Sequence, residues 1–153
     1  MARIRTLFDA AAVEEIKRRA ALLRPDSERQ WGRMNAAQAV AHCSVGLEWA
    51  VGDRIPSRMF LGRIIGRFVK PLVLRNDEPM RRNSPTAKDL VVRDERDLAV
   101  ERERMSKLID RFAAAGPKGC TSHPHSVFGP LTPDEWAILM YKHLDHHLRQ
   151  FGV

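Results

Sequence analysis

The sequence predicts an all-α protein: an antiparallel four-helix bundle with a short extra helix between the second and third main helices. Four segments repeat apolar residues at helical spacing, the stretches between them are rich in Gly and Pro, and strand-like alternation is scarce. The chain of 153 residues is long enough to bury a core without disulfide or metal staples. We therefore expect residues 1–153 to form a single domain.

The first two main helices have clear boundaries. The first is expected from about Thr6 or Asp9 to Leu23, and Pro25 stops it. The second begins at the N-cap Asn35, for which Gln38 is the capping-box partner. The inward-facing positions of the second helix are Ala39, His42, Val45, Gly46 and Trp49.

The segment 57–74 alternates apolar and basic residues. We interpret it as the short extra helix, packed on the bundle, because its apolar face is large enough to need covering. A helix that lies on a membrane surface or binds an acidic partner has similar chemistry. The apolar residues are Phe60, Leu61, Ile64, Ile65 and Phe68, and the basic residues are Arg63, Arg67 and Lys70.

The third and fourth main helices follow a loop over residues 76–88 and a brief extended stretch at residues 90–92. The third helix is expected from about Asp94 to Ala115, before the stop signal Gly116-Pro117. The fourth starts at Thr132, with Pro at its first position and Glu at its third, and reaches the chain end. Its inward-facing positions are Trp136, Leu139, Met140, His143, His147 and Phe151.

The charge pattern, the cysteines and the lack of a long apolar stretch limit which partners and which cellular location we expect. The net charge is +7 and the pI is near 10.1, but many arginines alternate with acidic residues, as in Glu101-Arg102-Glu103-Arg104. Such alternation is typical of solvated, ion-paired helix faces and not of a nucleic-acid-binding stripe. Cys43 and Cys120 fit no zinc-binding or Cys-x-x-Cys spacing, and no stretch of about 18–20 apolar residues occurs. We expect a cytoplasmic protein that binds neither nucleic acid nor membrane.

Three histidines give the strongest indication of function. His143 and His147 are one helical turn apart on the fourth helix, and His42 lies on the second helix. All three occupy inward-facing positions, where unpartnered imidazole nitrogens would be costly. Imidazoles at i and i+4 can reach one metal ion, so the sequence predicts a site for a divalent metal. Three neutral imidazoles leave one coordination position open, as in catalytic rather than structural zinc sites.

Other polar and aromatic residues are candidates for a second layer around this site. Gln38 and Gln150 could accept an imidazole N–H, as second-layer residues commonly do. His146 points off the inward face, so it is a second-layer or surface residue. His125 lies in a loop near the mouth of the bundle, where an ordinary loop histidine and a substrate contact are both open, and Trp49 could line a pocket.

Two motifs resemble a known superfamily. They are Gln30-Trp31-Gly32-Arg33-Met34-Asn35 leading to Ala41-His42-Cys43, and Phe128-Gly129-Pro130-Leu131-Thr132 through Glu135-Trp136 to Lys142-His143-Leu144-Asp145-His146-His147-Leu148-Arg149-Gln150-Phe151-Gly152. Together they resemble the DinB-like (YfiT-like) metalloproteins, and more narrowly a bacterial subfamily of unknown function among them. The resemblance implies a four-helix bundle, zinc or nickel held by His42, His143 and His147, and frequent homodimers.

The resemblance also implies a class of reaction. Characterised DinB-like proteins include metal-dependent transferases and isomerases that use low-molecular-weight thiols, and some hydrolases. We expect a small-molecule substrate and activation of a thiol or of water for attack on an electrophile. A metal-dependent hydrolase, and a non-catalytic basic interaction protein with a structural metal, are the alternatives. The superfamily commonly has Arg-Gly-Gln after the last ligand, whereas this chain has Leu148-Arg149-Gln150, so no particular thiol is implied.

Overall fold

The computed structural model describes residues 3–153. Within that range the protein is all-helical, as predicted, and has no strand. No helix in this range combines the length and the apolar character needed to cross a membrane. The elements are α1 (Ala10–Ala21), α2 (Ala36–Val51), α3 (Phe60–Leu74), the 3-10 turn η1 (Lys88–Leu90), α4 (Leu98–Ala115), the 3-10 turn η2 (Gly116–Gly119) and α5 (Pro133–Gln150).

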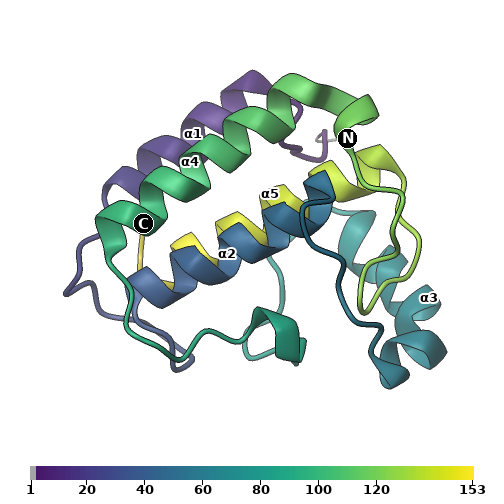
Figure 1. Cartoon of the computed structure of the whole chain (residues 1–153), viewed down its shortest axis with the longest axis horizontal. Coiled ribbons are helices and arrows are strands. Elements are labelled where there is room, and N and C mark those ends of the chain that lie inside the picture. Colours follow the sequence, from purple (N-terminus) through teal and green to yellow (C-terminus); the bar gives the residue numbers. More distant parts are fainter. Residues whose placement is uncertain (1–2) are drawn as a thin grey trace.

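Four long helices share one core. Helix α2 contacts both α4 and α5, and α1 contacts the same two helices (Figure 1). Helix α3 projects from one end of this group and touches α5 (Figure 1). The core includes positions predicted to face inward, such as Trp49 and Trp136, but also Tyr141 and Leu144, which were not predicted, because α5 is buried on more than one face. Its largest fully buried side chains include Ile16 of α1, Trp49 of α2, Ile109 and Phe112 of α4, and Trp136 and Tyr141 of α5.

Side-chain caps define where three of the helices start. The Asn35 side chain accepts from the backbone N–H of Gln38, and the Gln38 side chain accepts from that of Asn35, which confirms the predicted capping box. The same reciprocal pair joins Thr132 and Glu135 at the start of α5. Helix α4 starts at Leu98 rather than near Asp94, because Asp97 is the residue that caps it.

The predicted extended stretch at residues 90–92 is only partly correct. Leu90 ends a 3-10 turn, whereas Val91 has extended dihedral angles. Leu90 and Val92 are buried and Val91 is exposed, so the stretch alternates as a strand would. Within residues 3–153 it has no neighbouring strand, and Leu90 belongs to the hydrophobic core.

Helix α3 exists where it was predicted, but the expectation that the bundle covers its apolar face is wrong. The residues that face the body are Gly62 and Gly66, both buried. A Cβ atom at Gly66 would lie 2.1 Å from the carbonyl oxygen of Val127, so only glycine permits this contact between two backbones. The apolar side chains of the helix point to solvent instead: Phe60, Leu61, Ile64, Ile65, Phe68 and Leu72.

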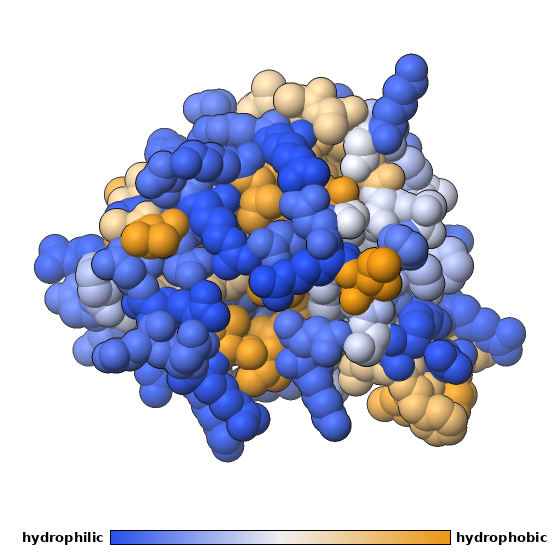
Figure 2. Space-filling model, viewed as in Figure 1, coloured by the Kyte–Doolittle hydropathy of each residue, from blue (hydrophilic) through white to orange (hydrophobic). Residues whose placement is uncertain are grey.

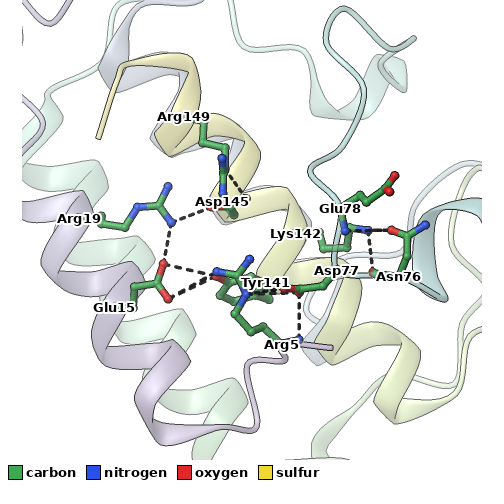
Figure 3. A network of polar contacts seen from close by, with 10 residues as sticks. All are labelled: Arg5, Glu15, Arg19, Asn76, Asp77, Glu78, Tyr141, Lys142, Asp145 and Arg149. Atoms are coloured by element: carbon green, nitrogen blue, oxygen red, sulfur yellow. Dashed lines mark hydrogen bonds and ion pairs between the residues drawn. The ribbon is translucent and has the colours of Figure 1, made fainter. Parts of the chain in front are cut away.

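A polar network ties α1 to the side of α5 that carries Asp145 (Figure 3). The Asp145 carboxylate, only 3% exposed, accepts from Arg19 at 2.7 Å and from Arg149 at 2.8 Å. Arg19 also pairs with Glu15. A buried carboxylate with two guanidinium partners is well compensated, so this network fixes how α5 is rotated against α1.

A second part of the same network ties α5 to the chain after α3. The Lys142 ammonium group is 4% exposed. It donates to the carbonyl oxygens of Val73 and Asn76 and to the Asn76 side chain. Because these acceptors include a carbonyl in the last turn of α3, the lysine holds that end of α3 against α5.

We predict that Gly66→Ala destabilises the protein. An exposed Gly→Ala change inside a helix normally adds up to about 1 kcal/mol of stability. Here the new methyl group would collide with the Val127 carbonyl, so we expect a loss of roughly 2–4 kcal/mol. Urea unfolding followed by circular dichroism measures it. The control is Arg67→Ala, an exposed neighbour, and a stabilised Gly66→Ala protein would contradict the packing of α3.

Candidate metal centre

The three predicted ligands meet in the structure. His42 comes from the middle of α2, and His143 and His147 come from successive turns of α5. One ring nitrogen of each residue lies within 4.8 Å of the corresponding nitrogens of the other two. The ring centroids are 4.5–5.0 Å apart, with the rings edge to face. The structure therefore contains a histidine triad that could hold one metal ion.

The His42 ring is held by a backbone carbonyl. Its Nδ1 lies 2.8 Å from the carbonyl oxygen of Leu90, in the 3-10 turn η1. A carbonyl oxygen can only accept, so Nδ1 carries the proton and Nε2 keeps its lone pair in the neutral ring. That Nε2 faces the triad, 2.8 Å from the Nε2 atom of His143. Leu90 thus orients His42 so that the nitrogen facing its partners is a potential metal ligand.

Gln150 holds the His147 ring in the same manner. The side-chain amide of Gln150 donates to the Trp31 carbonyl oxygen at 2.7 Å, which directs its own oxygen toward His147. That oxygen accepts from His147 Nδ1 at 2.8 Å. The amide passes close to Gly32, where a Cβ would lie 2.5 Å from the Gln150 nitrogen. His147 is therefore also protonated at Nδ1, and its Nε2 is free to bind.

A glycine on α2 makes room for the third ring. A Cβ at Gly46 would lie 3.1 Å from Nδ1 of His143, closer than ordinary packing allows. Gly46 is one turn beyond His42 on the same face of α2, so the His143 ring lies directly against the α2 backbone. The Nε2 atoms of His143 and His42 are close enough that either His143 donates a proton to His42 or a cation lies between them.

The surroundings keep all three imidazoles neutral at physiological pH. Burial lowers the pKa of His143 and His147 well below 6.5, and neighbouring imidazoles lower it further. Burial likewise lowers the pKa of His42. Neutral imidazole is the form that binds a metal. His143 and His147 remain partly exposed, whereas His42 is 3% exposed.

The triad dimensions fit a divalent transition metal. Two nitrogens on one tetrahedral zinc ion lie about 3.3 Å apart, because each Zn–N distance is roughly 2.0–2.1 Å. The His42–His143 nitrogen distance of 2.8 Å is somewhat shorter, and the whole set spans no more than 4.8 Å. Small rotations of the rings would let all three nitrogens share one ion. A cavity of about 10 Å³ borders His147, and its walls are almost entirely apolar, so it does not offer a water molecule the polar partners that it needs.

The second-layer predictions have mixed outcomes. Gln150 contacts a triad ring as expected. Gln38 does not take such a position, because its side chain is used in the α2 capping box and in a bond to the Asp94 carbonyl. His146 is buried and packs between His147 and Trp31, with ring centroids 5.0 Å and 5.4 Å away.

His125 and Trp49 pack against each other in the core. The His125 ring, 8% exposed, contacts Trp49, Trp136 and Phe128 at centroid distances of 5.0–5.6 Å. Its Nδ1 accepts from the backbone N–H groups of Val127 and Phe128, so it organises its own loop. His125 is therefore a structural core residue, and not the ordinary loop histidine that its sequence context allowed.

Two other potential ligands are excluded by their contacts or their direction. Asp145 lies in the same motif as the histidines, but its carboxylate bonds to Arg19 and Arg149 on the opposite side of α5. Cys43 is buried beside His42 in sequence, as a free thiol whose pKa is raised by burial. Neither residue belongs to the triad, so the donor set found in the structure consists of imidazole nitrogen alone.

Sequence reasoning missed three contributors to the triad. Leu90 and Trp31 act through their backbone carbonyls, which every residue has, so their residue types do not reveal these contacts. Gly46 lies on the predicted inward face of α2. A glycine at such a position could have indicated that a bulky side chain, here the His143 ring, packs against the helix backbone.

We predict that His125 makes the stability of the protein fall in acid. Burial, with a smaller effect of Arg58, lowers the pKa of His125 to about 4. An unfolded histidine has a pKa near 6.5, so the unfolded state binds the proton more readily. This contribution is complete above about pH 6.5 and is lost as the pH falls toward about 4. Between about pH 7 and about pH 5 the resulting decrease in the free energy of unfolding is about 2 kcal/mol.

The matched variant is His125→Asn, whose side-chain oxygen can still accept from the Val127 and Phe128 N–H groups. Urea unfolding with a chelator present, at both pH values, should show a smaller acid-induced loss for the variant than for the parent. The variant is also expected to be less stable at neutral pH, because the ring packing is gone. Equal losses would show that His125 does not titrate as its burial requires.

Comparison with known proteins supports a family but no function. Residues 1–152 match the model of a family described as "Protein of unknown function (DUF1569)". No curated protein matches the chain. No solved structure matches it. Because the family match spans almost the whole sequence, the protein belongs to the DUF1569 family.

Proposed function

We propose that the protein is a metal-dependent enzyme in which His42, His143 and His147 bind one divalent ion. One observation carries this proposal: three ring nitrogens lie within 4.8 Å of one another, and two of the rings are held by acceptors at Nδ1. Fixed Nδ1–H donors direct Nε2 lone pairs toward a common point, which is how ligating histidines are usually oriented.

The donor chemistry favours zinc or nickel. Imidazole suits zinc, nickel, copper and iron, whereas magnesium, calcium and manganese prefer oxygen ligands. The carboxylate nearest in sequence, Asp145, is held by two arginines and supplies no oxygen to the set. An all-nitrogen set also differs from the two-histidine, one-carboxylate arrangement typical of non-haem iron oxygenases.

Three protein ligands and partial exposure favour a catalytic role over a structural one. Structural zinc sites usually fill all four positions with protein ligands, whereas catalytic sites keep one open. A divalent ion held in this way supplies Lewis acidity, which lowers the pKa of a coordinated thiol or water toward neutrality. His42, His143 and His147 would hold the ion, with Leu90 and Gln150 fixing the orientation of His42 and His147. The partly exposed edge of His143 lies where a small substrate could approach.

We further propose that the chain is a DinB-like protein with an antiparallel four-helix bundle. The sequence resemblance and the pairwise contacts among α1, α2, α4 and α5 support this. On that basis the favoured reaction is transfer of a low-molecular-weight thiol to a small electrophile. The proposed location is the cytoplasm, where free thiols such as Cys43 and Cys120 stay reduced.

We predict that the protein binds one zinc or nickel ion per chain and that His143→Ala abolishes this binding. Loss of a ligand should weaken affinity by more than the roughly 10–100-fold seen for outer-layer residues. Isothermal titration calorimetry of chelator-treated protein measures it. His123→Ala is the matched control, because His123 is an exposed loop histidine. Unchanged binding in His143→Ala, or equal loss in both variants, would rule out the triad as the site.

A second measurement tests the class of reaction. Metal-loaded protein is assayed with thiol and electrophile pairs, using glutathione, bacillithiol or mycothiol, and separately with simple esters and amides. Thiol-dependent turnover that His143→Ala removes and His123→Ala keeps is the expected result. Turnover of esters or amides alone would replace the transferase proposal with a hydrolase. No turnover of either kind by metal-loaded protein would favour a structural ion.

A further inference from the structure

Helix α3 carries an exposed apolar face that the rest of the chain does not cover. Phe60, Phe68 and Leu72 are 80%, 60% and 72% exposed. Together with Leu61, Ile64 and Ile65, also exposed, they occupy a continuous arc of the helix, since their spacings are three, four or seven to eight residues. Figure 2 shows apolar side chains gathered over α3 at the lower right, beside hydrophilic ones. Large contiguous apolar patches of this kind mark interaction sites.

The rotation of α3 is fixed, so the apolar face cannot turn inward. Gly62 and Gly66 pack directly on the backbone of Ser126 and Val127. The Met59 N–H donates to the Ser126 carbonyl at 3.0 Å, and the Lys70 side chain donates to the Pro130 carbonyl at 3.0 Å. Every other rotation would force a larger side chain into the space that the two glycines leave. The exposure of the apolar face is therefore built into the fold.

Basic residues accompany this face without acidic ones. Between Arg54 and Arg75 the chain has six basic residues and no Asp or Glu. Arg54 pairs with Glu48 and Lys70 with Glu135. Within residues 3–153 the other four basic side chains of this stretch form no ion pair with a carboxylate: Arg58, Arg63, Arg67 and Arg75. Arg63 and Arg67 are one turn apart and border the apolar arc.

A hollow next to the apolar face has the same charge. It measures about 480 Å³ and lies between α3 and the start of α5. Its lining includes Arg67, Lys70 and Arg75 on the α3 side, with Phe128, Pro130 and Glu135 opposite. Three cations against one carboxylate make this hollow attractive to an anion such as a phosphodiester group.

We propose that α3 docks the protein on the surface of a membrane that contains anionic phospholipid. An apolar arc rich in Phe, Leu and Ile, next to Lys and Arg, is the composition of helices that lie in the interface of a bilayer. The aromatic and aliphatic side chains would enter the acyl boundary, and the basic residues beside them would contact lipid phosphates. This proposal departs from the sequence-based expectation that the protein has no membrane partner.

The length of α3 determines how it would lie. Fifteen helical residues measure about 22 Å, which is shorter than the roughly 30 Å hydrocarbon layer. Helix α3 would therefore lie in the plane of the membrane and not cross it. A second copy of this chain is a poorer occupant, because a two-fold contact through this face would bring two sets of unpaired arginines together.

The experiment is co-sedimentation of the full chain with vesicles. One set contains phosphatidylcholine alone and the other equal parts of phosphatidylcholine and phosphatidylglycerol. We expect binding to the anionic vesicles at least about tenfold stronger than to the neutral ones, and weaker at high salt. The double change Phe60→Ser and Phe68→Ser should reduce binding at least about tenfold. Arg63→Gln and Arg67→Gln should each reduce it about fivefold.

The matched control is Leu22→Ser with Val100→Ser, two exposed apolar residues, of which Leu22 is the C-cap of α1 and Val100 lies on α4. Circular dichroism establishes that every variant is folded, and sedimentation velocity gives the oligomeric state. Failure to bind anionic vesicles, equal binding to both vesicle types, or equal loss in the control would overturn the proposal. So would a dimer that the Phe60 and Phe68 changes dissociate, since that result would assign the face to a second copy. The assay is repeated with a chelator present. Because the chelator removes any bound metal ion, vesicle binding is then tested independently of the metal proposal.

Discussion

The need to satisfy imidazole nitrogens inside an apolar core organises this protein. Burying three rings among Trp, Leu and Met side chains is costly unless every ring nitrogen has a partner. Two of the outer nitrogens are satisfied by acceptors, the Leu90 carbonyl and the Gln150 side chain. Gln150 in turn needs the Trp31 carbonyl. Two irregular loops far apart in sequence are thus positioned by the same triad.

Helix α5 is buried on nearly all sides, and its two polar faces have different partners. The face with His143 and His147 meets α2, whereas the face with Asp145 meets Arg19 of α1. Rotating α5 to bring Asp145 toward the triad would break the buried ion pair between Asp145 and Arg19, which is costly because both side chains are largely shielded from water. The ion pair on one face therefore maintains the all-imidazole donor set on the other.

Periodicity and capping chemistry were enough to predict the helices and the triad. Histidines in phase with apolar residues must point inward, and the reciprocal caps at Asn35 and Thr132 set the starts of α2 and α5. The same reasoning could not find Leu90, because a backbone carbonyl in a loop is not encoded by side-chain type. It also misplaced Gln38. The side-chain oxygen of Gln38 could accept from an imidazole or from a backbone N–H at the helix start, and in the structure it accepts from the nearby Asn35 N–H.

The error at α3 has a different cause. A periodic apolar face indicates that a helix forms, but it does not tell whether the chain itself covers that face. The deciding residues were Gly62 and Gly66, which look like weak points in a helix and are in fact its contact surface. Their backbone approach to Val127 excludes side chains from the interface, so the larger apolar residues have to lie elsewhere on the helix.

The segment from His125 to Gly129 contacts both the helical core and α3. His125 and Gly129 exchange backbone hydrogen bonds, which closes the segment into a tight loop. On one side the His125 ring packs on Trp49 and Trp136 beside the triad. On the other side the Ser126 and Val127 backbone forms the surface on which α3 rests. The backbone that supports α3 and the buried His125 ring are therefore within two residues of each other in the sequence. The packing of α3 and the packing of His125 on Trp49 and Trp136 thus depend on the same loop.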